Sequence, residues 1–389
     1  IRGQETDVWA SQIKDPEMPQ HFLGRVGRQY QCNRQRFKAD ADYPTPKTFA
    51  AAAQWLKDNE GADDFFLQVE VFDPHEPFDA AEEFKKLYLD DFDKLYEWPR
   101  YALINDDETP EAIVHLRNLY MATLSMADKW LGVLLQEMDR QNLWEDTLVI
   151  FTSDHGHMLG EHGRTGKNMF HAWNEMAEIP LFIHLPGGKA AGKRYSAVTQ
   201  NIDLFPTILS WHGLKDWEKS VPYPVHGKDL LPLLNGETEW VRDFALYGWY
   251  GQPVNITDGH YTYFRAAVDD NQPLYWYGAA LTTFQRYLGN GIPNEYLDTG
   301  NYLPWAGIPV YRINQGEVGK SMAKFLAAKG LLPDPDLKES KLFDIDCDND
   351  QLSPIDNKEL EQQFCQYLIQ TMLEHQSPKE QFERLGLTM

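Results

Sequence analysis

The sequence predicts an α/β fold with a smaller α+β domain at its C-terminal end. A short, apolar and β-branched run at 148–151 is typical of a strand buried on both faces. Over 110–140, apolar side chains recur every three or four positions, which is the spacing of a helix that lies on a sheet. Beyond residue 236, aromatic residues alternate with small ones instead of forming continuous apolar runs. We therefore expect an α/β domain over 1–236 and a small α+β domain, with an antiparallel sheet and a helix, over 237–389.

The first domain is expected to alternate helices and strands. Apolar and β-branched residues over 65–71 predict a strand, which the long helix and the strand at 148–151 follow in the chain. This strand–helix–strand order predicts two parallel strands joined by a right-handed crossover. The expected elements are, in order, helix 47–59, strand 65–71, helix 110–140, strand 148–151, strand 179–183 and helix 200–209.

The C-terminal domain is expected to combine an antiparallel hairpin with a final helix. Residues 244–265 alternate aromatic and small side chains around the turn Thr257-Asp258-Gly259, which is typical of a hairpin. The segment 271–335 is rich in Tyr, Trp, Gly and Pro and is predicted to form long loops. A strand at 342–345 precedes a helix, and the apolar face of that helix is marked by Leu360, Phe364, Leu368 and Met372.

The charge balance narrows the classes of partner. The formal net charge is −23, which opposes binding to nucleic acid or to an anionic lipid membrane. No stretch approaches the roughly 18 apolar residues of a membrane span, and the three cysteines have no paired spacing. An anionic substrate would therefore need a local concentration of positive charge. The basic cluster at 25–38 is interpreted as a solvated loop in preference to an anion-binding patch.

Asp154 and His155 follow the strand at 148–151 and are the first candidate site residues. In open α/β sheets, ligands bind at the C-terminal ends of the strands. A carboxylate oxygen and an imidazole nitrogen suit Ca²⁺, Mg²⁺, Mn²⁺ or Zn²⁺. The alternative is that Asp154 caps a turn and that His155 is an ordinary residue at the edge of the sheet.

Two other segments supply weaker candidates. His75 follows the predicted strand 65–71 and lies between two prolines, where a structural turn is the alternative role. Lys167 is a lone cation on the loop after the metal candidates, and surface solvation is its alternative role. His171 and Trp173 lie further along the same loop and are candidates for the wall of a pocket, although loop residues beside a site often only pack.

Taken together, several segments resemble the sulfatases of the alkaline-phosphatase-like superfamily. The matching segments run from about residue 45 to the end of the chain, in the order of that family. They are FDPHEPFD (72–79), LVIFTSDHGHMLGEHG (148–163), Lys167 followed by EIPLFIHLPG (178–187), QNIDLFPTIL (200–209), GKDLLPLLNG (227–236), VNITDGHYTYF (254–264), LFDID (342–346) and ERLGL (383–387). The resemblance implies a large mixed α/β sheet sandwiched by helices, with a small C-terminal domain built on an antiparallel sheet.

The resemblance also implies a role for each candidate. In this family one divalent metal, usually Ca²⁺ and Mn²⁺ in some phosphonate- and diester-cleaving relatives, binds the transferring group. Asp154 and His155 look like the second pair of its ligands. Lys167 looks like the lysine that contacts the charged oxygens of the substrate, and His75 like the histidine near the leaving-group oxygen. Such donors would surround the negative oxygens of the transition state, so we expect the four side chains to converge on one cleft.

The sequence departs from the family at the nucleophile. The family uses a formylglycine made from Cys or Ser in a Cys/Ser-x-Pro/Ala-x-Arg motif, and Cys32-Asn33-Arg34-Gln35-Arg36 lacks the Pro or Ala. The paired Asp ligands at the end of the family's first strand have no match either. We expect the chain to be the C-terminal part of a longer sulfatase, partnered by the missing N-terminal segment. A degenerate relative is the alternative.

The expected function is hydrolysis of a small-molecule or carbohydrate sulfate ester. A phosphonate monoester or phosphodiester hydrolase of the same superfamily is equally compatible with the Asp-His pair. A catalytically inactive binding protein is the alternative from another class. The aromatic runs 247–250 and 275–277 suggest that the substrate carries a carbohydrate or aryl group, although core packing explains them equally well.

Overall fold

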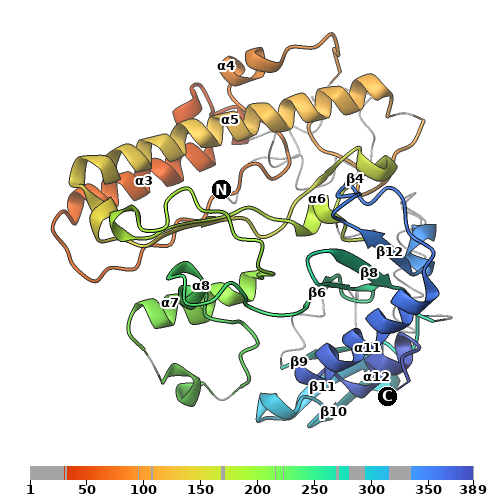
Figure 1. Cartoon of the computed structure of the whole chain (residues 1–389). Coiled ribbons are helices and arrows are strands. Elements are labelled where there is room, and N and C mark those ends of the chain that lie inside the picture. Colours follow the sequence, from red (N-terminus) through yellow and green to blue (C-terminus); the bar gives the residue numbers. More distant parts are fainter. Residues whose placement is uncertain are drawn as a thin grey trace. The chain divides into compact units, whose positions relative to one another are not determined.

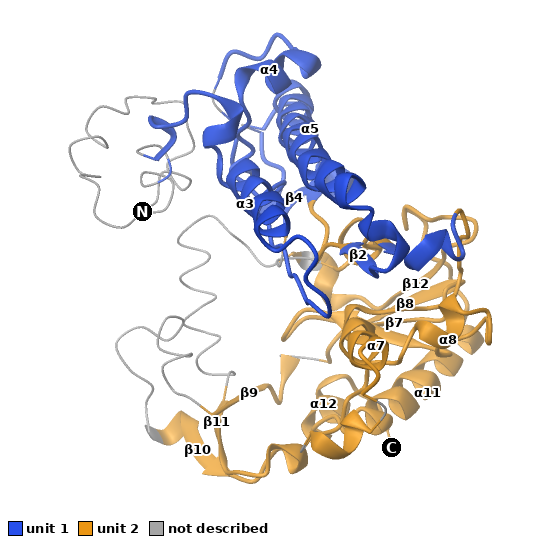
Figure 2. Cartoon of the chain, turned by 90° about the vertical axis from the view of Figure 1, so that its left-hand side faces the viewer, with its two compact units in different colours: residues 1–151, 158–166, 182–191 blue, residues 152–157, 167–181, 192–389 orange. Residues whose placement is uncertain are grey.

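The chain divides into two compact units (Figures 1 and 2). The computed structural model describes residues 30–388 with gaps at 31–32, 95, 107, 168–170, 215, 222, 269–270, 280–293 and 315–333. Unit 1 comprises residues 1–151, 158–166 and 182–191, and unit 2 comprises residues 152–157, 167–181 and 192–389. The domain division at residue 236 stays a prediction.

Two long helices form the framework of unit 1. Helix α3 spans Pro44–Asp58 and helix α5 spans Pro110–Gln141, which confirms both predicted helices. Thr109 caps α5 by accepting a hydrogen bond from the backbone N–H of Ala112 (3.3 Å), and Asn142 ends it in a left-handed conformation. The two helices lie side by side (Figure 1) and share a buried apolar cluster made of Phe49, Ala52, Ala53, Leu56, Leu134 and Met138.

The segment 65–71 is extended but is not a strand, so the strand predicted there is wrong. Its side chains alternate in burial, and the inner ones pack on the cluster shared by α3 and α5; they are Phe65, Leu67, Val69 and Val71. The alternation in the sequence therefore reports burial correctly. A ladder also needs a neighbouring backbone, which the sequence pattern does not specify. The predicted crossover from this segment to 148–151 fails for the same reason.

Strands β2 (Val149–Thr152) and β5 (Leu181–His184) pair with each other, which confirms both predicted strands. The burial on both faces that was predicted for 148–151 is wrong, because Phe151 is 45% exposed. Phe182, on β5, is 66% exposed. Their rings lie 6.0 Å apart. Phe66, in the extended segment, is also exposed. Large apolar side chains on this part of unit 1 therefore lie open in the described structure.

A small antiparallel sheet holds the outer part of the loop between β2 and β5. Strands β1 (Ala102–Leu103), β4 (Arg164–Gly166) and β3 (Met158–Leu159) pair in the order β1-β4-β3 within unit 1. The sequence predicted only a polar loop there. The stretches on either side of it, 152–157 and 167–181, belong to unit 2.

Arg34 corrects the interpretation of one residue of the basic cluster at 25–38, whose residues 25–29 lie outside the described residues. Its guanidinium lies 2.7 Å from Asp79 and 2.7 Å from Glu97. Lys85, the last residue of helix α4 (Glu82–Lys85), lies 2.9 Å from the same Asp79 carboxylate. Burial raises the pKa of Glu97. Arg34 therefore belongs to a buried network of ion pairs, and a solvated loop is the wrong description of it.

Four antiparallel strands form the main sheet of unit 2, in the order β12-β8-β7-β6. Their bounds are Ala245–Gly248 for β6, Val254–Thr257 for β7, Tyr261–Arg265 for β8 and Lys341–Asp344 for β12. These confirm the predicted hairpin and the later strand. Helices α11 (Lys358–Glu374) and α12 (Lys379–Arg384) pack on the sheet through a buried cluster that includes Ile256, Tyr263, Leu342, Phe364, Leu368 and Phe382. The predicted final helix is α11.

A second antiparallel sheet lies in the segment that was predicted to form loops. Strands β9 (Tyr275–Gly278), β10 (Leu297–Gly300) and β11 (Val310–Asn314) pair in the order β10-β11-β9. The loop prediction is wrong for these strands. Glycine and proline in the segment indicated breaks, but the tyrosines and the tryptophan between them favour strands.

A buried ion pair connects three parts of unit 2. The turn η7 (Asn201–Asp203) leads into helix α7 (Leu204–Trp211), which confirms the helix predicted there. The Asp203 carboxylate accepts hydrogen bonds from Arg242 (2.7 Å) and from the backbone N–H of Lys228 (2.8 Å). Both members of the ion pair are buried. The pair therefore joins α7 to the segment before the short helix α8 (Leu231–Leu234) and to the residues that lead into β6.

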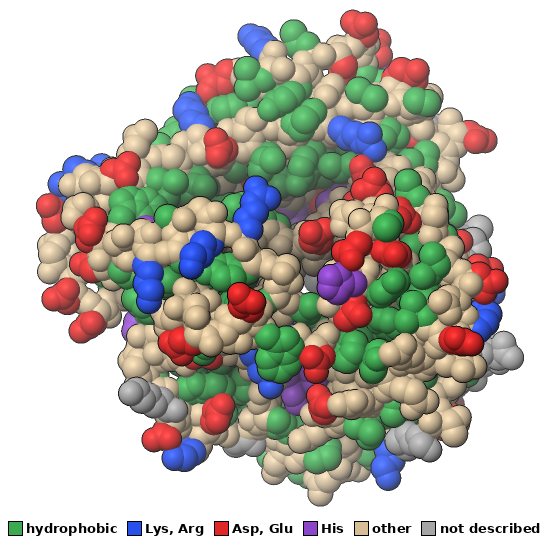
Figure 3. Space-filling view, in the orientation of Figure 1, with side chains coloured by type: hydrophobic (Ala, Val, Ile, Leu, Met, Phe, Trp, Pro, Cys, Tyr) green, Lys and Arg blue, Asp and Glu red, His purple; other side chains and the backbone are tan. Residues whose placement is uncertain are grey.

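The surface carries many carboxylates. Acidic side chains are spread over the face shown in Figure 3, among fewer basic ones, as the net charge of −23 implies. Cys347 and Cys365 are free thiols. Within the part of the chain that the structure describes, no helix has both the length and the apolar character needed to cross a membrane.

Asp203→Ala is predicted to destabilise the protein strongly, because it leaves the buried charge of Arg242 without its partner. Removal of one member of a buried pair costs about 3–5 kcal/mol, to be measured as the free energy of unfolding in urea. The double variant Asp203→Leu/Arg242→Met is expected to lose less free energy of unfolding than Asp203→Ala, since it leaves no isolated buried charge. The control is Asp216→Ala, which breaks an exposed pair with Lys219 (2.7 Å). If both single variants unfold alike, the ion pair does not organise this unit.

Candidate active site

Asp154 and His155 lie just after β2, in the stretch 152–157 of unit 2. Oδ1 of Asp154 accepts a hydrogen bond from the backbone N–H of His155 (2.8 Å), so this oxygen caps the turn as the alternative role expected. Oδ2 lies 3.5 Å from Nε2 of His155, and the carboxylate is 83% exposed. The two side chains therefore present an oxygen and a nitrogen next to each other at an open position.

The other ring nitrogen of His155 defines its tautomer. Nδ1 lies 2.8 Å from the carbonyl oxygen of Gly156, so Nδ1–H donates to that oxygen, and in the neutral ring with this tautomer Nε2 carries the lone pair. A histidine that binds a metal commonly donates its second N–H to a carbonyl in this way. The pair thus fits one carboxylate and one imidazole ligand of a divalent cation. The described residues contain no group of three or more His, Cys, Asp or Glu arranged to hold a metal.

Two neighbouring segments hold this turn in place. The backbone N–H of Gly156 donates to the carbonyl of Met176 (2.9 Å) in the short helix α6 (Asn174–Ala177). A Cβ atom at Gly156 would lie 1.7 Å from the carbonyl oxygen of Glu175, so only glycine allows this close approach. From another direction, the amide nitrogen of Asn201 lies 3.4 Å from the carbonyl oxygen of Asp154. The turn is therefore fixed from α6 and from η7.

Sequence reasoning missed Asn201 and Trp249 as neighbours of Asp154 and His155. The Trp249 ring lies 6.1 Å from the ring of His155 at an angle of 72°. Tyr250, the next residue, lies 5.4 Å from Trp276 on β9. The aromatic run was visible in the sequence, and so was the segment that contains Asn201. Neither pattern shows which of its side chains reaches the end of β2.

Lys167 follows β4 and is buried, with only 6% of its surface exposed. Surface solvation, the alternative role for this lysine, is therefore wrong. A buried ammonium group is costly unless it is compensated, so its retention indicates a structural or functional interaction. Contact with the oxygens of a substrate stays a prediction.

His171 and Trp173 are core residues of unit 2. They are 1% and 2% exposed, and the His171 ring stacks on Phe264 with centroids 4.9 Å apart. Nε2–H of His171 donates to the carbonyl oxygen of Asp336 (2.9 Å), and burial lowers the pKa of His171 to about 4. The ring is therefore neutral at neutral pH and anchors its loop to β8. Contact between these two residues and a substrate stays a prediction.

His75 lies in unit 1, whereas the other candidates lie in unit 2. Its Nδ1 is 2.6 Å from the carbonyl oxygen of Glu76, and its ring lies 4.2 Å from the ring of Phe72. About a third of the side chain is exposed, 32%. Neighbouring residues thus hold the His75 ring in place, and the contact with Glu76 uses Nδ1 rather than Nε2. The convergence of His75 with Asp154 stays a prediction.

Comparison with known proteins identifies relatives of most of the chain. The sequence model of the sulfatase family matches residues 5–214. The choline-sulfatase of Rhizobium meliloti is 31% identical over 234 residues, which cover 55% of this chain and 44% of that protein. The N-acetylglucosamine-6-O-sulfatase of Bacteroides thetaiotaomicron is 33% identical over 139 residues, or 35% of this chain and 24% of that protein. The matched regions thus span less than half of either relative.

Solved structures share the fold at low sequence identity. The protein yidJ of Bacteroides fragilis, assigned to the sulfatases, superposes with a TM-score of 0.58 at 18% identity, covering 89% of this chain and 61% of that one. The phosphonate monoester hydrolase of Agrobacterium radiobacter gives a TM-score of 0.53 at 19% identity, covering 87% of this chain and 62% of that one. At these identities the similarity concerns the fold alone.

Asp73→Asn is predicted to stabilise the protein at high pH but not at low pH. Burial raises the pKa of Asp73 to about 6. Because this folded value lies above the unfolded one, the ionised carboxylate destabilises the folded state. This destabilisation is absent below about pH 4 and complete above about pH 6. We expect a gain of about 1–3 kcal/mol in the free energy of unfolding at pH 8 and none at pH 3.5. The control is Asp63→Asn, on the surface of the same unit. Equal gains at the two pH values would contradict the argument.

Proposed function

Because the chain belongs to the sulfatase family and shares its alkaline-phosphatase-like α/β fold, we propose that it is part of a hydrolase that cleaves sulfate esters. The observation that carries the proposal is the pair of Asp154 and His155 at the end of β2. Its carboxylate is open, and its imidazole is held with Nε2 beside that carboxylate.

Asp154 and His155 would hold a divalent cation, with Ca²⁺ preferred and Mn²⁺ or Mg²⁺ as alternatives. When bound, such a cation acts as a Lewis acid that neutralises the oxygens of the sulfuryl group. Hard oxygen ligands favour Ca²⁺ or Mg²⁺, whereas imidazole is more usual for transition metals. The identity of the cation therefore depends on the remaining ligands.

Lys167 and His75 would act on the two ends of the breaking bond. A buried ammonium group at Lys167 would face little competition from water, so its attraction for a sulfuryl oxygen would be strong. His75 would donate a proton to the leaving alcohol oxygen as the bond to sulfur breaks. The nucleophile would be a formylglycine from outside these 389 residues, which contain no motif for it. The short span of the match within longer relatives supports this part of the proposal.

The substrate proposed is a small-molecule or carbohydrate sulfate ester. Among the relatives are the N-acetylglucosamine-6-O-sulfatase mentioned above and an ulvan-active sulfatase from Formosa agariphila. Trp249 lies beside His155, and the ring of Tyr250, the next residue, lies 5.4 Å from that of Trp276. Aromatic faces of this kind bind the apolar side of a sugar or an aryl ring.

Initial rates on an aryl sulfate and on a matched aryl phosphonate monoester test the reaction class. The enzyme should be the native protein that contains this chain, assayed before and after treatment with a chelator. Metal-dependent turnover of the sulfate supports the proposal. Preference for the phosphonate would establish the second candidate reaction, and binding without turnover of either ester would indicate the inactive binding protein.

Lys167→Ala is predicted to lower kcat with little change in KM, because the ammonium acts most strongly on the charge of the transition state. The expected loss is about 2–4 kcal/mol of transition-state stabilisation, as for a single oxyanion donor. Lys167→Arg should rescue poorly, since a planar guanidinium doesn't reproduce a compact charge. The control is Lys219→Ala, at an exposed lysine. Unchanged turnover in Lys167→Ala would remove this residue from the site.

A further inference from the structure

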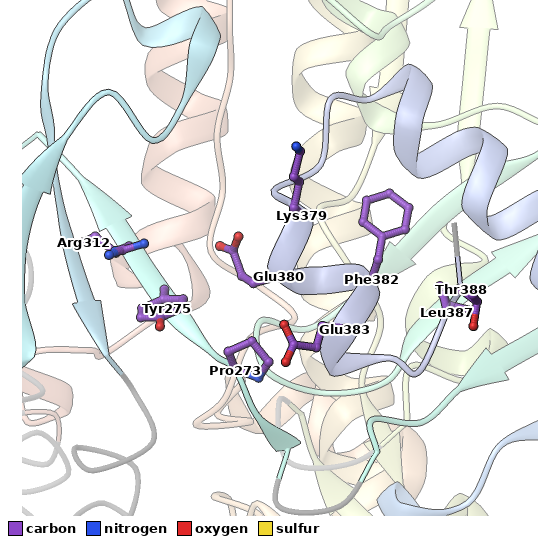
Figure 4. Close-up of a pocket in the computed structure, with 9 residues that line it drawn as sticks. All are labelled: Pro273, Tyr275, Arg312, Lys379, Glu380, Phe382, Glu383, Leu387 and Thr388. Atoms are coloured by element: carbon purple, nitrogen blue, oxygen red, sulfur yellow. The ribbon is translucent and has the colours of Figure 1, made fainter.

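A pocket of about 860 Å³ lies in unit 2 between β9, β11 and α12 (Figure 4). Its size is that of a site for a small ligand. Pro273 and Tyr275 form one side, and the largely buried Phe382 and Leu387 contribute apolar surface on the other. None of these residues belongs to the set assigned above to the sulfatase reaction.

The polar lining carries equal numbers of cations and carboxylates. Arg312 and Lys379 supply donors, and Glu380 and Glu383 supply acceptors. Figure 4 shows the side chain of Glu380 pointing towards the strands that carry Tyr275 and Arg312. A ligand that only accepts or only donates hydrogen bonds could bond to only half of these charged groups.

The Arg312 guanidinium is held in a fixed plane. It lies 4.7 Å from the ring centre of Tyr275 and 4.0 Å from that of Tyr302. On neighbouring β10, Asp298 lies 3.1 Å from the guanidinium and also accepts a hydrogen bond from the Tyr302 hydroxyl. On β9, the Tyr277 hydroxyl donates a hydrogen bond to the Glu380 carboxylate. Arg312 and Glu380 are therefore positioned before any ligand arrives, which lowers the entropic cost of binding to them.

Arg384 fixes the wall that contains Pro273 to helix α12. Its buried guanidinium donates to the side-chain oxygen of Asn271 (2.9 Å) and to the carbonyl of Gln252 (3.2 Å). The amide of Asn271 donates in turn to the carbonyl of Gly251 (2.8 Å). The two sides of the pocket are thus tied together by hydrogen bonds behind it.

We propose that this pocket binds a saccharide unit. Sugar hydroxyls both donate and accept, so they satisfy the mixed lining, and the C–H face of a sugar ring fits against Tyr275 and Pro273. A simple anion would meet two carboxylates in a protein of net charge −23. A purely apolar ligand would strip water from four charged groups without replacing their hydrogen bonds. The inference goes beyond the proposed hydrolysis, because it requires binding and no turnover.

Affinity electrophoresis of the native protein that contains this chain tests the proposal. Native gels would contain dextran, xylan, galactomannan, carrageenan or chondroitin sulfate, which together sample neutral and sulfated polysaccharides. We expect retardation by at least one of them. In the double variant Lys379→Ala/Glu383→Ala and in Tyr275→Ala the affinity should fall roughly tenfold or more, which corresponds to loss of one or two good polar or ring contacts. Tyr275→Phe should retain most of it, since the ring remains.

The matched control is Lys338→Ala/Glu339→Ala, an exposed pair elsewhere in unit 2 whose loss also leaves the net charge unchanged. Thermal unfolding of each variant checks that it folds. Failure of all five polysaccharides to retard the wild-type chain would overturn the proposal, and so would equal retardation of the pocket variants and the control. Because dextran, xylan and galactomannan carry no sulfate ester, retardation by these three is independent of the sulfatase proposal.

Discussion

The buried pair of Asp203 and Arg242 is the interaction on which the candidate site in unit 2 depends. Asp203 ends the turn η7, and Asn201 at the start of the same turn has its amide 3.4 Å from the carbonyl oxygen of Asp154. A buried ion pair adds little net stability compared with apolar packing, but it admits few alternative arrangements. We infer that the pair fixes the turn, and that the turn then helps to fix the backbone that presents Asp154 and His155.

Local signals in the sequence predicted local structure well. Helices α3, α5 and α11 carry their apolar stripes within one segment, and the hairpin of β7 and β8 carries its turn between its strands. The segment 65–71 and the strands β9 to β11 depend on partners that are distant in the sequence. The alternation in 65–71 predicted the burial of its side chains correctly, but the segment does not pair as a strand. The glycines and prolines after residue 271 suggested loops where the structure has strands. Pairing is a property of two segments, so neither pattern alone decides it.

The same limit applies to the site. The position of Asp154 and His155 after an apolar run is a local feature and was predictable. The contact of Gly156 with α6 and the approach of Trp249 to His155 join distant segments, so they emerged only from the structure. The burial of Lys167 is also invisible in a glycine-rich loop. Sequence reasoning thus selected candidate residues but did not reveal the contacts that orient them.

The exposed phenylalanines and the small number of proposed metal ligands would share one physical explanation. Asp154 and His155 would offer two ligands, whereas protein-bound Zn²⁺ takes about four and Ca²⁺ about six to eight. Phe151, only three positions before Asp154, is 45% exposed, and exposed apolar patches mark surfaces that other groups cover. Any protein segment that covered Phe151 would bring its own side chains close to the end of β2. The contact that would bury the open apolar strand is therefore the one best placed to supply the remaining ligands.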